Sequence, residues 1–540
     1  MNRRRIAWPL IVSFVAAVGF LVAAAHGADA VRITKAPYLQ NAGPTAITVQ
    51  YEASAPGDGQ VRYGVGALGS TAPAQLFEKV EYAEGGKGSQ VTVYLYRARL
   101  TGLKPGTEYQ YQVVHGGVSA PAKTLRTWPE QADRVTFIAY GDTRTQPDKH
   151  RAVARNFARH DPAFILNVGD LITDGNQYWR WDHEFFDAVA DVMDHVPMIF
   201  ARGNHEKSDK NLLRLFDMPD GRTWTSFTYG PVHVVVLDNY IDRDEVLTWL
   251  AKDLAASTAP WKIVMAHEPA FNFSGHVSES GRKTFLPILE RAGVDVFVTG
   301  HSHEYERFAP LARVGPALEP KVPVAAGADA KAARHPMTFI TSGGGGAPPC
   351  PAAPESDILL KSVSKYHYCV FTVDRETLRM QAFTSDGKDL DAFTITKKDG
   401  RYDQAYMAQA KPMEAAILAQ GLIRLEAGLD GGAKAKDADA EMSGKVRFTG
   451  LTEPATVEAR LAEASAKAYA MDPVTVTAKP GEEPVLSVKV RPGQGTARPA
   501  LRLVLTARVG PVQQSRETAD IGWPKPGQKK KPAKSEEEEK

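Results

Sequence analysis

The sequence has 540 residues, which at about 150 residues per domain indicates three or four domains. Its 65 Lys and Arg residues balance 63 Asp and Glu residues, for a formal net charge of +2. This balance excludes a basic field for nucleic acid over the whole chain and an acidic, solvating chain. Two cysteines exclude a disulfide-dense scaffold and a Cys-rich zinc or iron–sulfur site. Cys350 and Cys369 are either a disulfide pair or two buried thiols, and the sequence does not decide between them.

The N-terminus has the pattern of a targeting segment. Three arginines within residues 1–5 precede an apolar stretch over residues 6–25, and Ala28-Asp29-Ala30 resembles a signal-peptidase site. We therefore expect residues 1–30 to be a signal peptide, and the mature protein to be secreted or periplasmic with no membrane span. The alternative is an uncleaved anchor, because an apolar run of about 20 residues approaches the length that spans a bilayer.

Residues 31–128 have an all-β pattern. The segments 46–51, 91–96 and 109–114 are rich in β-branched and aromatic residues, as strands are. Tyr109 follows a Pro-Gly turn, at the position of a tyrosine corner in a β-sandwich. The segment resembles a fibronectin type III module, which would act as a spacer or as a rim for a neighbouring site.

Residues 134–396 alternate between strand and helix patterns, which predicts an α/β layered catalytic domain. A helix is expected over residues 182–194, with a stripe packed on the sheet that consists of Phe185, Phe186, Val189, Val192 and Met193. The Ala-, Pro- and Gly-rich residues 311–336 are expected to form a loop or an insertion.

The remainder of the chain indicates a small, β-rich C-terminal domain over residues 411–522. A helix is expected over residues 411–427, with Pro412 near its start, followed by strands over 444–448, 474–478, 485–490 and 501–509. Residues 523–540 hold blocks of lysine and glutamate and are expected to be a disordered, solvated tail.

Candidate metal ligands follow five apolar strands, each at the strand's carboxyl end. These ends converge on one crevice in α/β sheets. Each motif alone is common in turns or on surfaces, but five in this order are hard to produce by chance. The residues are Asp142 after 135–140, Asp170 after 164–168, Asn204 after 198–201, His267 after 263–266, and His301 with His303 after 294–299.

The chemistry of these side chains suits hydrolysis at two cations. Carboxylate, amide and imidazole ligands fit iron, zinc or manganese, and the lack of thiolates argues against a structural zinc site. One carboxylate can bridge two ions held at the separation that two-metal hydrolysis requires.

At these residues the sequence resembles the calcineurin-like metallophosphoesterase superfamily, and the preceding sandwich makes it most similar to the purple acid phosphatase branch. The resemblance covers roughly residues 31–396 and implies a four-layer αββα fold. It implies one metal at Asp142, Asp170 and His303, and a second metal at Asp170, Asn204, His267 and His301. His205 resembles the family's phosphate-contacting histidine, which would stabilise the transition state or protonate the leaving oxygen. Asp174 is expected either to orient His205 or to cap a turn.

Two positions depart from the family pattern. Purple acid phosphatases have a tyrosine three residues after the bridging aspartate, where this chain has Thr173. Other members of the superfamily have a histidine two residues after the first aspartate, where this chain has Arg144. The first metal site therefore lacks both versions of one ligand. Arg144 either faces the substrate phosphate, which suits a guanidinium, or pairs with a nearby carboxylate.

Further residues beside the motifs are candidates for supporting roles. Residues 342–346 bring backbone close to the site or form a flexible turn, and Glu206 and Glu268 are candidates to orient neighbouring ligands. Tyr178, Trp179 and Trp181 either line a pocket for an aromatic leaving group or are buried in the core.

Together these features predict an exported dinuclear phosphoesterase that hydrolyses phosphate monoesters by attack of a metal-bound hydroxide. Its partners would be small phosphate esters and not a nucleic acid polymer, and the oligomeric state is not indicated. One alternative is a phosphodiesterase acting on nucleotides or phospholipid head groups. Another is a binding or adhesion protein whose metal centre is impaired at Arg144 and Thr173.

Overall fold

The structure is a computed structural model of the whole chain. It describes residues 31–241, 243–314, 322, 335–421, 442–447, 455–466, 468–479, 482, 484–493, 501–509 and 512–517. The expected signal peptide, most of the 311–336 insertion and the charged tail lie outside these residues. Among the described residues, no helix is both long enough and apolar enough to cross a membrane.

The N-terminal domain is a sandwich of antiparallel strands in the order β1-β2-β5-β4-β3-β6-β7, with β8 paired to β6. The hydroxyl of Tyr109 accepts a hydrogen bond from the Lys104 backbone N–H at 2.8 Å, which is the predicted tyrosine corner. The strands are β1 (Ile33–Gln40), β2 (Ala46–Ala53), β3 (Gly59–Gly64), β4 (Ser70–Ala83), β5 (Gln90–Thr101), β6 (Glu108–His115), β7 (Val118–Ser119) and β8 (Lys123–Arg126).

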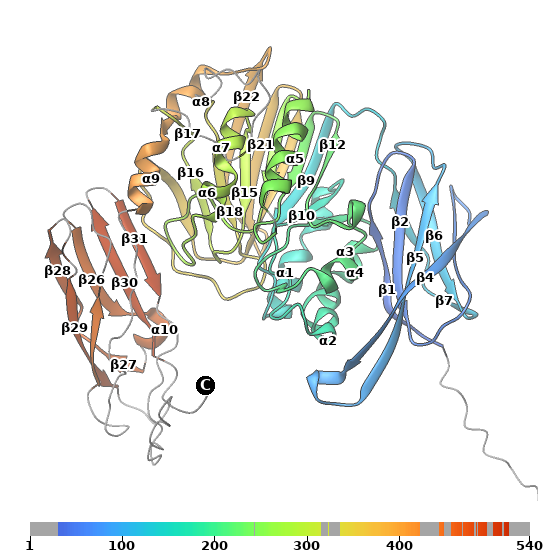
Figure 1. Cartoon of the computed structure of the whole chain (residues 1–540), viewed down its shortest axis with the longest axis horizontal. Helices are drawn as coiled ribbons and strands as arrows, with labels where there is room; N and C mark the ends of the chain where they lie inside the picture. The colour runs from blue at the N-terminus through green and yellow to red at the C-terminus, as the bar shows by residue number, and fades with distance from the viewer. Residues whose placement is uncertain are drawn as a thin grey trace, which may run out of the picture.

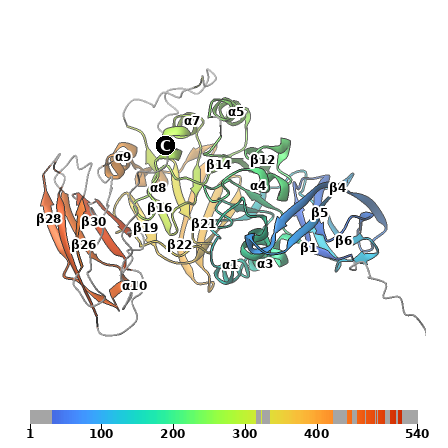
Figure 2. The same ribbon diagram turned by 60° about the horizontal axis from the view of Figure 1, so that its bottom comes forward.

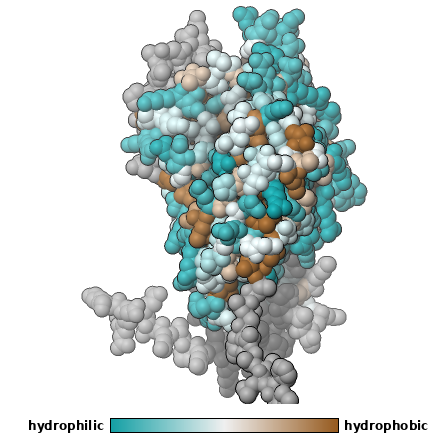
Figure 3. All heavy atoms as spheres, turned by 90° about the vertical axis from the view of Figure 1, so that its right-hand side faces the viewer, coloured by the Kyte–Doolittle hydropathy of each residue, from teal (hydrophilic) through white to brown (hydrophobic). Residues whose placement is uncertain are grey.

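The hairpin of β4 and β5 is longer than the rest of the sandwich and extends beside the catalytic domain (Figure 1). The short helix η1 (Glu84–Gly86) at its tip contacts α2 (Tyr178–Arg180) of that domain. The face of the sandwich that points away from the catalytic domain carries hydrophobic side chains in separate groups among hydrophilic ones (Figure 3).

The catalytic domain contains two seven-stranded mixed sheets. In the first, the order is β11-β10-β9-β20-β21-β22-β23: β9 (Arg134–Tyr140), β10 (Ile165–Asn167), β11 (Met198–Phe200), β20 (His367–Asp374), β21 (Thr377–Thr384), β22 (Asp389–Lys398) and β23 (Arg401–Tyr402). In the second, the order is β12-β13-β14-β15-β18-β16-β19: β12 (Thr225–Tyr229), β13 (Val232–Val236), β14 (Trp261–Met265), β15 (Val296–Thr299), β16 (Tyr305–Phe308), β18 (Thr338–Ser342) and β19 (Leu359–Val363).

Hydrophobic packing arranges these sheets and the helices in four layers, as Figure 2 shows from the side. A fully buried cluster that includes Phe137, Val234, Ile263 and Phe371 fills the space between the sheets. Helices of 147–193 cover the outer face of the first sheet, and helices of 243–291 cover that of the second. The predicted αββα fold is therefore confirmed. The helices are α1 (Pro147–Ala154), η2 (Phe157–His160), α2, η3 (Trp181–Phe186), α3 (Asp187–Met193), α4 (Lys210–Leu215), η4 (Pro219–Gly221), α5 (Arg243–Ala256), α6 (Ser280–Thr284) and α7 (Leu286–Arg291).

The helix expected over residues 182–194 is present in two parts. Its first part, η3, is a π-helical turn, and α3 continues from it. All members of the predicted apolar stripe are buried in the cluster on the outer face of the first sheet. The apolar spacing predicted the buried face but not the wider π-turn, which hydrophobic periodicity does not encode.

The C-terminal part holds a three-stranded sheet, β25-β29-β27, and a four-stranded sheet, β28-β26-β30-β31. Three of their strands, β26, β27 and β31, were absent from the sequence-based prediction. Residues 411–421, expected to open this domain, instead belong to the catalytic domain, since β24 pairs with β17 and Met413 is buried in its core. The elements are β17 (Leu311–Ala312), α8 (Gln404–Gln409), β24 (Lys411–Pro412), α9 (Met413–Gly421), β25 (Met442–Arg447), β26 (Ala455–Leu461), α10 (Glu463–Ala466), β27 (Tyr469–Ala470), β28 (Val474–Ala478), β29 (Val485–Pro492), β30 (Leu503–Val509) and β31 (Val512–Glu517).

The sandwich and the catalytic domain share an extensive interface. The hydroxyl of Tyr38 donates to the Leu215 carbonyl, and that of Tyr111 to the Asp194 carbonyl, each at 2.6 Å. Tyr178 donates in the other direction, from the catalytic domain to Glu52 at 2.6 Å. Buried apolar residues of the sandwich continue directly into the core around α3.

Candidate metal centre

The six predicted ligands lie together at the carboxyl ends of parallel strands from both sheets. β9, β10 and β11 are parallel neighbours in the first sheet, and β14 and β15 are parallel neighbours in the second. The loops after these strands therefore meet at one edge of the two-sheet core. Their side chains are Asp142, Asp170, Asn204, His267, His301 and His303, of which the two aspartates and His267 are almost fully buried.

Four of these side chains form a compact group around one point. His267 Nε2 and His301 Nδ1 each lie 3.1 Å from the Asn204 Oδ1 atom and 3.3 Å from each other. Asp170 Oδ1 lies 3.4 Å from His267 Nε2. The ring of His267 is oriented by its Nδ1–H, which donates to the Val168 carbonyl at 2.9 Å and leaves the lone pair of Nε2 facing the group.

This group suits a cation because its atoms offer lone pairs and few of them carry a proton. Burial, followed by the charge of His267, lowers the pKa of His301 to about 3, so its ring is neutral. Burial raises the pKa of Asp170, but His267, His205 and Arg144 outweigh it and lower the value to about 2. A carboxylate, an amide oxygen and two imidazoles are ligands that zinc, manganese and iron accept.

The first predicted group has a different environment, because a guanidinium lies among its ligand atoms. Arg144 Nε donates to Asp170 Oδ2 at 3.2 Å, and Arg144 Nη2 lies 3.1 Å from His303 Nε2. The Asp142 Oδ2 atom accepts from the His301 backbone N–H at 3.0 Å. Asp142 Oδ1 is buried without a hydrogen-bond partner among the described residues and lies 3.6 Å from His303 Nε2. Arg144 thus pairs with a carboxylate, the second of its two predicted roles.

The backbone of the ligand loops is held in uncommon conformations. Asp142, Asp170 and His301 have φ values of 55°, 55° and 69°, in the left-handed region that non-glycine residues rarely adopt. Such strain is typical of sites where surrounding structure fixes the ligands. Gly169 has a φ of 101°, and a Cβ there would lie 2.8 Å from His267 Nδ1 and 2.9 Å from the Gly203 nitrogen. Only glycine therefore allows this close approach.

The Glu206 carboxylate links the two loops that contain Asp170 and Gly203. It accepts hydrogen bonds from the backbone N–H groups of Asp170 at 3.1 Å, Leu171 at 2.7 Å and Gly203 at 2.6 Å. Burial and the nearby Asp170 carboxylate raise the pKa of Glu206 to about 8. Glu206 therefore orients ligands through their backbone, as predicted. Glu268 instead accepts from Ser278 at 2.6 Å.

His205 lies on the open side of the centre with a fixed ring. Its Nδ1–H donates to the Thr173 carbonyl at 2.6 Å, and its backbone N–H donates to Asp170 Oδ1 at 2.9 Å. Nε2 then faces the ligands, 4.0 Å from Asp170 Oδ2. Burial lowers the pKa of His205, although the Asp170 carboxylate opposes this effect.

Asp174 does not orient His205 in this structure. Its carboxylate accepts from the Asn176 backbone N–H at 3.1 Å and from Gln177 Nε2 at 2.8 Å. This is the turn-capping role, which short acidic side chains perform by bonding backbone two residues on. The Thr173 carbonyl takes the place that the prediction gave to Asp174, and a backbone partner carries no signal in a single sequence.

Asp174→Asn is expected to leave turnover nearly unchanged. Asparagine keeps an oxygen that can accept from the Asn176 N–H, so the turn should persist. We expect kcat for p-nitrophenyl phosphate within about three-fold of wild type and an unshifted pH profile, since loss of a proton-transfer partner costs about 10²-fold or more. A pH–rate profile that differs from that of wild type would show instead that Asp174 orients His205.

The glycine-rich residues 342–346 lie close to the centre rather than forming a free turn. The Gly345 N–H donates to the Gly141 carbonyl and the Ala347 N–H to the Asp142 carbonyl, each at 2.8 Å. Tyr178 and Trp181 are buried, at 4% and 0% exposure, and so belong to the core rather than to a leaving-group pocket. Trp179 is half-buried beneath the Arg180 guanidinium.

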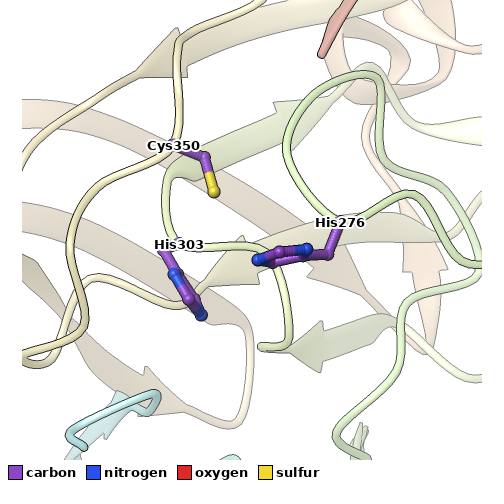
Figure 4. A group of neighbouring side chains, drawn as sticks. All are labelled: His276, His303 and Cys350. Atoms are coloured by element: carbon purple, nitrogen blue, oxygen red, sulfur yellow. The ribbon is translucent and has the colours of Figure 1, made fainter. Parts of the chain in front are cut away.

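Two residues near the centre were missed by the sequence-based prediction. His276 and Cys350 extend from separate loops toward His303 (Figure 4), and ligand atoms of the three lie within 4.8 Å of one another. Neither residue follows a strand, so the pattern of strand ends could not reveal them. Cys350 and Cys369 are both thiols and are not joined as a disulfide.

Comparison with known proteins agrees with this geometry. Residues 135–305 match the model of the calcineurin-like phosphoesterase family, and residues 35–127 match the model of the purple acid phosphatase N-terminal domain. An uncharacterized protein of Mycobacterium tuberculosis is 28% identical over 315 residues, which cover 48% of this chain and 59% of that protein. Purple acid phosphatase 18 of Arabidopsis thaliana is 27% identical over 258 residues, covering 42% of this chain and 58% of that protein. The chain thus matches less than two thirds of the length of these relatives.

A solved structure supports the fold. The purple acid phosphatase from yellow lupin seeds superposes with a TM-score of 0.56 and 18% identity, covering 71% of this chain and 78% of that one. Both the sandwich and the αββα domain thus have family matches in the order observed. The chain is therefore similar to the calcineurin-like phosphoesterases over residues 135–305 and, with its N-terminal domain over residues 35–127, to the purple acid phosphatases.

Proposed function

We propose that this protein is an exported, metal-dependent phosphatase that hydrolyses small phosphate monoesters. The observation that carries the proposal is the convergence of Asp170, Asn204, His267 and His301. His267 Nε2 lies 3.4 Å from Asp170 and 3.1 Å from Asn204, and His301 Nδ1 lies 3.1 Å from Asn204 and 3.3 Å from His267. Export is supported by the arginines and apolar run of residues 1–30.

These four side chains would hold one cation, with Asp170 presenting its other oxygen to a second position formed with Asp142 and His303. A cation in that second position would have to displace the Arg144 guanidinium from Asp170 and His303. When bound, the metal would activate the water nucleophile and neutralise charge on the phosphoryl oxygens. Iron, zinc and manganese all suit these ligands.

The chain's own groups would position the substrate and exclude water. The ring of His205 is held by the Thr173 carbonyl with Nε2 toward the centre, so Nε2, when protonated, would donate to a phosphoryl or leaving oxygen. Glu206 fixes the loops of Asp170 and Gly203 and so keeps the ligands in place without reorganisation during the reaction.

The test is a panel of esters with the metal-loaded protein. We expect turnover of p-nitrophenyl phosphate to exceed that of bis(p-nitrophenyl) phosphate, to disappear after chelation, and to return with zinc or manganese. Faster turnover of the bis-ester would favour a phosphodiesterase. No turnover of any ester by protein that holds metal would favour the binding or adhesion alternative.

The iron(III)-loaded protein is expected to be colourless. The purple of the related phosphatases arises from a tyrosinate ligand, and the corresponding residue here is Thr173, which has no phenol. A visible absorption spectrum checks this prediction, with Thr173→Tyr as the matched variant that should gain a charge-transfer band. A strong band in the wild-type protein would contradict it.

A further inference from the structure

We propose that Arg144 is a built-in cation that occupies the first metal position, so that the resting protein binds one metal tightly and not two. This inference rests on the proposed metal centre, and it assigns a residue that the family pattern does not supply. Three observations carry it: the partners of the guanidinium, the tautomer of His303, and the completeness of the neighbouring group.

The guanidinium bonds the same atoms that a first metal would use. The two oxygens of Asp170 face different ways: Oδ1 lies toward His267, and Oδ2 accepts from Arg144 Nε at 3.2 Å. On its other side Arg144 Nη2 lies 3.1 Å from His303 Nε2. A planar guanidinium with donors on two nitrogens can bridge two acceptors that would otherwise coordinate one cation.

Because of the tautomer of His303, Arg144 and a metal would compete for the same lone pair on Nε2. His303 Nδ1 lies 3.1 Å from the Pro348 carbonyl, which can only accept, so Nδ1 carries the proton. Nε2 of the neutral ring then has the lone pair, and it accepts from Arg144 Nη2. A metal at this position needs that same lone pair, so it binds only after the guanidinium leaves.

The position of Arg144 is also fixed by its backbone and by burial. Its N–H donates to the Asp170 carbonyl at 3.3 Å, and the preceding Thr143 N–H donates to the same carbonyl at 3.0 Å. The side chain is only 15% exposed. Displacement would therefore leave a buried charge without its carboxylate partner, which is unfavourable. The neighbouring group of Asp170, Asn204, His267 and His301 contains no such competitor among the described residues.

The first metal position, beside Asp142 and His303, should still bind a metal weakly. This determines the metal affinity that the experiment is expected to find. Asp142 Oδ1 has no hydrogen-bond partner among the described residues. A second metal should therefore bind, but with an affinity about 10–100-fold weaker than in a variant without the guanidinium, the range found when groups around a metal site are altered.

The experiment measures metal stoichiometry and not only activity. Chelated, metal-free full-length protein is titrated with Zn²⁺ by calorimetry, and bound metal is counted by mass spectrometry after gel filtration. We expect one tight equivalent in wild type and two in Arg144→His, whose imidazole can act as a ligand. Arg144→Ala should bind a second equivalent less tightly than Arg144→His but more tightly than wild type.

Arg151→His is the matched control. Arg151 lies on α1 and bonds the exposed Asp148 at 2.9 Å, so its replacement removes the same charge outside the centre and should leave one equivalent. Anomalous scattering from wild-type crystals grown with Zn²⁺ provides a second readout that needs no variant, and one strong peak is expected.

Two tight equivalents or two equal peaks in wild type would overturn the inference. A single equivalent in all three Arg144 forms would overturn it as well, because the guanidinium would not be the limiting group. If the stoichiometry rises as expected but no ester is hydrolysed, the assignment of Arg144 stands while the proposed phosphatase function fails.

Discussion

Asp170→Asn is expected to lower kcat/KM for p-nitrophenyl phosphate by about 10³-fold or more, a loss typical of removing a group that organises transition-state charge. Asp170 belongs to both predicted metal groups, with Oδ1 toward His267 and Oδ2 toward Arg144. Asparagine has almost the same shape, so packing should be preserved while the negative charge and one acceptor oxygen are lost. The variant should therefore keep its fold, with some loss of stability because the buried Arg144 guanidinium loses its carboxylate partner.

Steady-state kinetics and bound zinc should be measured on the same preparation of Asp170→Asn. We expect the tight zinc equivalent to be lost together with activity, and the midpoint of thermal unfolding of metal-free protein to fall because Arg144 loses its carboxylate partner. Asp148→Asn is a suitable control, because this side chain is 94% exposed at the start of α1. Near-normal turnover by Asp170→Asn would refute the proposed centre.

Glu206→Ala is expected to lower the free energy of unfolding by about 3–5 kcal/mol, because each buried donor left without an acceptor costs about 1–3 kcal/mol. Three buried backbone N–H groups, of Asp170, Leu171 and Gly203, would lose the carboxylate that accepts their hydrogen bonds. Unpaired buried donors account for most of this cost. Because these groups position two ligand loops, activity should fall with stability.

Urea-induced unfolding of metal-free protein measures the change directly, since bound metal would mask it. Lys207→Ala is the matched control, because the adjacent Lys207 side chain is exposed. Its expected effect is within about 0.5 kcal/mol, as for ordinary surface substitutions. An equally small effect of Glu206→Ala would show that water or another group satisfies the three donors.

The ligand set could be predicted because its signal is local and repeated. Each of Asp142, Asp170, Asn204, His267 and His301 follows an apolar strand, and the rule that parallel strands deliver residues to one edge placed them together. The alternation of strand and helix patterns predicted a layered α/β domain, and the resemblance to metallophosphoesterases implied that it has four layers. No knowledge of distances was needed for either conclusion.

Other features depend on contacts between distant segments, which a single sequence does not encode. Arg144 was a candidate for either phosphate or carboxylate, and its 3.2 Å bond to Asp170 in the structure could not be read from the sequence. Asp174 is four residues from Asp170, yet its partners are Asn176 and Gln177. The residue that orients His205 is reached through a backbone carbonyl, so its side-chain type carries no information.

The interface of the N-terminal sandwich has a consequence for how the chain gains its stability. Tyr38 of the sandwich packs on Phe186 and Phe216 of the αββα domain, with ring centroids 5.0 and 6.5 Å away. One hydrophobic core is therefore continuous between the two domains. We therefore expect the sandwich and the adjoining layers to unfold as one cooperative unit, because their interface is large and hydrophobic. The loops that carry the predicted metal ligands are therefore kept rigid partly by the N-terminal sandwich, which contributes none of those ligands.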